Sequence, residues 1–176
     1  MDTLKTGKYP QRVVERYPVE AKVLSLAIGE GVIYLCTDQG LMKLSDDKIS
    51  TLSSDLIFTS VHICADGRVV ADCESKAYLI GDKGAQLLYD FGEQVADIKD
   101  NGSLYVLTDN ALYVERDEGF YNLARCEQKG ECLALFGERV CVSNNRCLQR
   151  MEGKRRTWRC IFLITQLDKR DFPKSS

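Results

Sequence analysis

The sequence predicts an all-β fold built from about four repeats, each containing four short antiparallel strands. The first observation is that apolar and polar residues alternate over short runs, which is the period of a half-buried strand. The second is that Gly, Asn and Asp recur every 8–12 residues, as turns between short strands require. The third is that a similar segment returns about every 36 residues. Apolar stripes at the spacing i, i+3, i+4 are missing, which excludes a helical array.

Composition places the chain among globular proteins. It has 176 residues, 44% of them hydrophobic and 28% charged, and a net charge of −2, so it is long enough for one domain with a core. No apolar run could span a membrane, and residues 1–20 lack the apolar stretch of a signal peptide. We therefore expect a cytoplasmic location without a membrane span, in which the eight cysteines are reduced thiols.

The repeats occupy residues 23–158. Their second strands contain anchor residues at intervals of 36, 35 and 36 residues, namely Tyr34, Val70, Tyr105 and Cys141. In the first and third repeats, the Tyr stands three residues before Thr-Asp and seven before Leu. The predicted first strands are 23–28, 61–65, 95–98 and 132–136, followed by turns at 29–31, 66–67, 101–102 and 137–138. The predicted third strands are 41–44, 77–80, 112–114 and 148–151. The predicted fourth strands are 49–52, 86–88, 120–123 and 157–158.

Two segments flank the repeats. Residues 1–22 form an N-terminal segment with one predicted strand, Arg12–Tyr17, between two prolines. Residues 159–176 form a C-terminal tail that leaves the pattern, because one apolar strand at 160–164 is followed by no second hairpin. We therefore expect the chain to stop within a unit.

Four antiparallel strands repeated every 35–45 residues are typical of β-propeller blades. Segment 33–42, IYLCTDQGLM, resembles blades of the two-component-regulator type and of degenerate WD40-like propellers. The resemblance covers residues 23–158 and implies four propeller-like blades of four strands. The Trp-Asp and Gly-His signatures of true WD40 blades are missing. A sandwich or barrel in which alternating strands happen to recur is the alternative.

Blades this short are more typical of a larger ring, although propellers range from 4 to 8 blades. We therefore expect an incomplete part of a larger propeller: a fragment, a truncated isoform, or a chain that closes its ring with a partner. Open blade faces and unpaired strand edges would then be exposed. Propeller families commonly close the ring with a lone strand before the first blade, which is the role we expect for Arg12–Tyr17.

The sequence predicts no catalytic residue and no metal site. Its one histidine, His62, lies in an apolar strand and is expected to be structural. No two cysteines have the C-x-x-C spacing of a zinc site. Cys132, Cys141 and Cys147 take strand positions that aliphatic or aromatic residues fill in other repeats, so they are expected to be small buried hydrophobes.

No cofactor is expected either. The segments Asp82–Gly84 and Asp97–Gly102 lack the ligand order of an EF-hand, so their acidic residues are expected at hairpin corners. Gly-rich phosphate loops are missing. The basic stretch Lys154–Arg159 could attract phosphates, but residues 1–149 carry a net charge of about −7 against +5 in the rest of the chain. Nucleic acid is therefore not an expected partner.

These absences favour a non-enzymatic protein–protein interaction or scaffold module whose loops present a surface to protein partners. The alternative is a ligand-sensing propeller that binds a small molecule or polymer at its central mouth, as the resemblance implies. A third hypothesis is an enzyme that uses Asp38 and Asp109, which follow Thr at equivalent positions. We expect these two residues to fix turns through local backbone hydrogen bonds instead.

Overall fold

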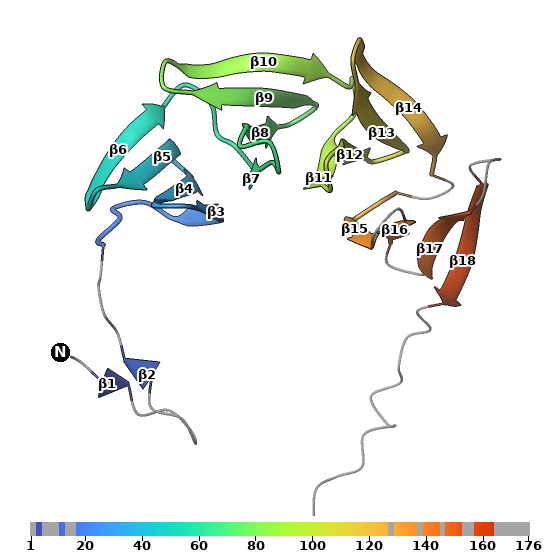
Figure 1. Ribbon diagram of the computed structural model, residues 1–176, viewed down its shortest axis with the longest axis horizontal. Coiled ribbons are helices and arrows are strands. Elements are labelled where there is room, and N and C mark those ends of the chain that lie inside the picture. The colour runs from blue at the N-terminus through green and yellow to red at the C-terminus, as the bar shows by residue number, and fades with distance from the viewer. Residues whose placement is uncertain are drawn as a thin grey trace, which may run out of the picture.

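The computed structural model describes residues 3–4, 11–12, 17–126, 129–136, 139–144, 147–152 and 157–163. In these residues every regular element is a strand, as predicted. Four sheets follow one another along the chain and stand side by side around an open arc (Figure 1). Each sheet has four antiparallel strands in sequence order, and we name the sheets blades 1 to 4.

Blade 1 contains β3 (Val23–Gly29), β4 (Val32–Thr37), β5 (Gly40–Ser45) and β6 (Lys48–Ser53). Blade 2 contains β7 (Ser60–Ile63), β8 (Val69–Cys73), β9 (Lys76–Gly81) and β10 (Gly84–Asp90). Blade 3 contains β11 (Val95–Asp100), β12 (Leu104–Thr108), β13 (Ala111–Arg116) and β14 (Gly119–Arg125). Blade 4 contains β15 (Cys132–Phe136), β16 (Arg139–Ser143), β17 (Cys147–Glu152) and β18 (Thr157–Leu163).

The flanking segments differ in part from the expected pattern. Before blade 1, β1 (Thr3–Leu4) pairs with β2 (Gln11–Arg12). Residues 13–16 of the expected ring-closing strand lie outside the described residues, as do the predicted turn at 137–138, residues 154–156 of the basic stretch and the tail from residue 164. The last strand, β18, runs five residues past the boundary expected at residue 158, because its apolar end pairs with β17.

The first strand of each blade lies on the inner side of the arc and the fourth on the outer side (Figure 1). The strands β3, β7, β11 and β15 are therefore sheet edges that line the middle of the arc. This is the arrangement of propeller blades around a central axis.

The hydrophobic core is divided into three parts, one between each pair of neighbouring blades. Alternate residues of a strand point to opposite faces of its sheet. We name the side that packs on the next blade the forward face and the opposite side the rear face. The core residues include Cys36, Leu41, Val61 and Ala71 between blades 1 and 2, Val70, Ala77, Ile98 and Val106 between blades 2 and 3, and Leu107, Leu112, Leu133 and Val142 between blades 3 and 4.

The anchor residues of the repeat lie on forward faces. Tyr34 packs into the core between blades 1 and 2, Val70 into the next core and Tyr105 into the third. The residue after each anchor takes the rear face, where Ala71 and Val106 are fully buried. The 36-residue period of the sequence therefore corresponds to the packing of each blade against the next.

The second hairpin of blades 1 and 3 is held by a buried threonine. The Thr37 hydroxyl donates to the carbonyl of Gly40 at 2.8 Å, and the Thr108 hydroxyl donates to that of Ala111 at 3.1 Å. Gly40 has φ = +117°, and a Cβ there would collide with the backbone carbonyl of Ser53. Only glycine fits this turn without strain.

Candidate functional site

The rear face of blade 1 is an apolar sheet surface with no described blade against it. On β3, alternate residues Leu24, Leu26 and Ile28 point to this face, and Ile49 of β6 is also exposed. Leu26 is 54% exposed and Ile28 is 69% exposed, although both lie within a regular strand. An alternating strand normally buries the residues of its apolar side, so this face is the strongest candidate for a binding surface.

Comparison with the other blades shows what the rear face of blade 1 lacks. Leu26 pairs with Leu35, the residue after the first anchor. The residues in the same register of the other blades are Val61, Ile98 and Leu133, which are 6%, 2% and 1% exposed. Each of these three is covered by the forward face of the preceding blade. Leu26 is exposed because no blade precedes it among the residues that the structure describes.

Covering this face would be energetically favourable. Removing an apolar side chain from water stabilises a fold or a complex by about 25 cal/mol per Å², or about 1.5–3 kcal/mol for a fully buried Leu or Ile. Because the four exposed aliphatic residues share one face, their contributions would combine on binding of a single flat surface. These four residues belong to no functional motif of the sequence, although the first repeat has more large aliphatic residues in its first strand, VLSLAI, than the others.

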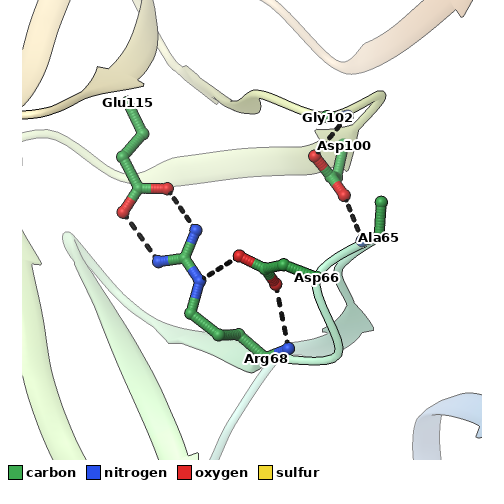
Figure 2. Close-up of polar contacts among 6 residues, drawn as sticks. All are labelled: Ala65, Asp66, Arg68, Asp100, Gly102 and Glu115. Atoms are coloured by element: carbon green, nitrogen blue, oxygen red, sulfur yellow. Dashed lines mark hydrogen bonds and ion pairs between the residues drawn. The ribbon is translucent and has the colours of Figure 1, made fainter.

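A second cluster joins blades 2 and 3 at the end of the sheets that carries the β7–β8 turn. Arg68 donates to both carboxylate oxygens of Glu115, at 2.8 and 2.6 Å, and to Asp66 at 2.6 Å (Figure 2). Asp100 accepts from the backbone N–H of Gly102 at 2.9 Å and from that of Ala65 across the junction.

These contacts satisfy the charges of the cluster. Hydrogen bonds from the backbone N–H and the side chain of Arg68 lower the pKa of Asp66, and the bonds to Glu115 and Asp66 raise the pKa of Arg68. Bidentate pairs of this kind fix geometry strongly. The cluster therefore acts as a clamp between two blades and leaves little charge available for a ligand.

The inner side of the arc contains a cavity of about 500 Å³ that β3, β7 and β11 line, with Ser25, His62 and Lys99 on its wall. Burial, followed by the nearby charge of Lys99, lowers the pKa of His62. Asp97 accepts from Lys99 at 2.8 Å and from the backbone N–H of Leu133 in blade 4 at 2.8 Å. At neutral pH the cavity thus offers an uncharged imidazole beside an ion pair, which suits hydrogen bonding to a small polar ligand.

The cysteines form no metal site among the described residues. Cys36, Cys64, Cys73, Cys126, Cys132 and Cys141 are free thiols, and the described residues contain no group of three or more His, Cys, Asp or Glu that could hold a metal ion. Burial raises the pKa of Cys36 and Cys64 to about 12, so these thiols stay protonated and unreactive. Cys132 is exposed, in contrast to the burial expected for it.

The aspartates of the third hypothesis lie in separate turns. Asp38 accepts from the backbone N–H of Lys22 at 2.9 Å, and Asp109 forms an ion pair of 3.0 Å with Lys129. They belong to the second hairpins of two different blades, blade 1 and blade 3. No helix in the described part of the chain is long and apolar enough to cross a membrane.

Comparison with solved structures identifies the class of this architecture. The chain has a β-propeller-like repeat fold, as predicted, and its open sheets are those of an incomplete propeller. No family model matches the sequence, and no curated protein matches it.

Three solved structures illustrate the similarity. The chain is similar to the extracellular domain of the one-component system BT4673 from B. thetaiotaomicron, with a TM-score of 0.69 and 11% identity over 86% of this chain and 23% of that one. It is similar to virginiamycin B lyase from Staphylococcus aureus, with a TM-score of 0.67 and 15% identity over 83% and 57% of the two chains. It is also similar to the N-terminal domain of Nup159, with a TM-score of 0.54 and 14% identity over 82% and 44%.

These values establish the fold alone, and the chain spans between 23% and 57% of the length of those three proteins. They also correct one prediction. The expectation of a non-enzymatic chain is wrong as an inference from this architecture, because virginiamycin B lyase and a streptogramin B lyase at 12% identity are enzymes with the same fold. A propeller with few catalytic side chains is therefore not excluded from catalysis, and the shared fold assigns no reaction to this chain.

Proposed function

We propose that this chain is a protein-interaction module that binds a β-sheet of a partner through the rear face of blade 1. The exposure of Leu26 carries the proposal. Its register equivalents Val61, Ile98 and Leu133 are buried by a neighbouring sheet, so the position is built for such a contact.

The junctions within the chain indicate what the partner sheet must offer. Between blades 1 and 2, the forward face contributes the small residues Ala27 and Cys36 beside the larger Tyr34 and Leu41. Val61 of blade 2 packs against this face. A partner face with small apolar residues at its centre would accommodate Leu26 and Ile28 in the same way. Apolar surfaces that bind partners are commonly surrounded by polar residues, which keep the free protein soluble.

A second candidate function is ligand sensing at the inner side of the arc, and the cavity beside His62 supports it. One similar structure, at 15% identity, is described as an auxiliary nutrient binding protein. The test is a thermal-shift screen of small polar molecules. A compound that raises the Tm of the wild type but not that of His62→Ala would support this function, and a screen without such a compound would count against it.

The interaction proposal is tested by placing a photo-activated crosslinking amino acid at position 26 in the cells that produce the chain. We expect efficient crosslinks to a peptide from a strand of a partner. The matched control is position 87, because Leu87 is also a strand leucine, is 52% exposed, and lies on the outer strand β10 away from the rear face of blade 1. Equal crosslinking at both positions would refute the proposal.

A further inference from the structure

We infer that the partner sheet is blade 4 of a second copy of this chain, so that two copies close one ring. This inference rests on the proposed function and names its partner. Every junction within the chain joins the forward face of one blade to the rear face of the next. In the described residues, the rear face of blade 1 and the forward face of blade 4 are the two faces that no blade covers.

The forward face of blade 4 has the features that a blade 1 partner needs. Ala134 pairs with Cys141 in the register in which Ala27 pairs with Tyr34 in blade 1. Ala134 is exposed, although it lies in the regular strand β15. The small side chain of Ala134 leaves room for larger residues, so Leu26 and Ile28 of another copy can pack against this face.

Charge also favours blade 4 over other occupants. Residues 23–53 of blade 1 contain four acidic and two basic residues, a net charge of −2. The described residues of blade 4 contain one acidic and three basic residues, Glu152 against Arg139, Arg150 and Arg159, a net charge of +2. Opposite charge favours the encounter of blade 1 with blade 4, whereas two copies of blade 1 would repel each other. A contact between two copies of blade 1 would also place large side chains directly against large side chains.

The symmetry of the contact allows a closed assembly. A contact between two different faces of the same chain generates a ring if the rotation closes and an open chain of copies if it does not. Two copies supply eight blades, which lies within the range of 4 to 8 that propellers adopt. In such a ring both copies use both faces, and no apolar face stays exposed.

The test is the mass of the purified full chain, measured by light scattering over a dilution series in reducing buffer. We expect a mass twice that of the 19.9 kDa chain, independent of concentration until the pair dissociates on dilution. We expect Leu26→Asp and Ala134→Asp each to weaken the pair about 100-fold or more, because each places a charge in an apolar contact. The control Leu87→Asp should leave the mass unchanged.

Mixing the two variants separates the modes of association. Each variant keeps one intact face, so an equal mixture of Leu26→Asp and Ala134→Asp should form pairs that neither forms alone. If two copies met through blade 1 on both sides, Ala134→Asp would still pair by itself, which would overturn the inference. If Leu26→Asp fails to give a cooperative melt, Ile28→Asp replaces it, because Ile28 is more exposed and a charge there is easier for the fold to tolerate.

Other outcomes are equally decisive. A wild-type chain that stays single at all concentrations, or that grows without limit into longer assemblies, would overturn the closed pair. If the crosslinker at position 26 then captured a strand of a different protein, the proposed function would stand without this inference. Crosslinks from position 26 to the 132–143 segment of a second copy would support both.

Discussion

Because the carboxyl group of Asp72, on β8, is buried, we predict that the free energy of unfolding falls as pH rises from 4 to 6. Its side chain is 2% exposed, and it accepts a hydrogen bond from the hydroxyl of Ser60. Burial raises its pKa from 3.8 to about 6, and the Ser60 bond offsets only part of this rise. The folded chain therefore binds a proton at this site more tightly than the unfolded chain does.

The sign of the effect follows from this difference in proton binding. Between about pH 4 and 6 the folded state holds the proton and the unfolded state releases it, so the free energy of unfolding falls as pH rises. A rise in pKa from 3.8 to about 6 corresponds to about 3 kcal/mol of stability, present below pH 4 and lost above pH 6. The pKa of Asp66 and of Asp90 is lowered, so those exposed groups act in the opposite direction.

The assay compares urea unfolding of the wild type and of Asp72→Asn at a series of pH values from 4 to 7. The amide keeps an oxygen that can accept from Ser60 but cannot ionise, so subtraction isolates the site. We expect the stability of the variant, measured relative to the wild type, to increase by up to about 3 kcal/mol from pH 4 to pH 7. A difference that is constant with pH would refute the reasoning.

Three further predictions concern the junctions and turns. Tyr34→Ala and Tyr105→Ala should each lower stability by about 2–4 kcal/mol in thermal melts, because both rings pack between blades. A loss below about 1 kcal/mol for both variants would contradict the repeat register. Arg68→Ala should lower the free energy of unfolding by about 1–2 kcal/mol, because it removes the bonds to Glu115. A coupling energy near zero in a double-mutant cycle with Glu115→Ala would show that this pair does not stabilise the fold. Gly40→Ala should lower the free energy of unfolding, measured in urea, by about 2–4 kcal/mol, because the new Cβ is strained and collides with Ser53. The control Gly31→Ala is also at positive φ but lies in open space, so it should lower stability by about 1 kcal/mol. Equal losses would argue against the collision.

The repeat was predictable because it is local in the sequence. Anchor spacing identified Tyr34 and Tyr105 as equivalent, and the structure places both on forward faces. Turn residues were predictable for the same reason: Gly67 and Gly102 have φ values of +85° and +99°, which the pairs Asp66-Gly67 and Asn101-Gly102 favour.

The candidate site could not be predicted in the same way. Alternation shows that Leu24, Leu26 and Ile28 share a face, but it does not show whether another sheet covers that face. The clamp between Arg68 and Glu115 joins residues 47 positions apart and depends on how two blades pack. Asp72 looks in the sequence like an ordinary polar strand residue, and only the neighbouring blades show that it is buried.

The division of the core into three separate junctions also determines how the chain would unfold. In an array whose units contact only their neighbours, stability is a sum of unit and junction terms, and each end unit lacks one junction. In a single copy, blades 2 and 3 each have two junctions, so their backbone amides should exchange with deuterium most slowly, while blades 1 and 4 open first. Closing the ring would remove this gradient, because an array without ends has no unit from which fraying can start.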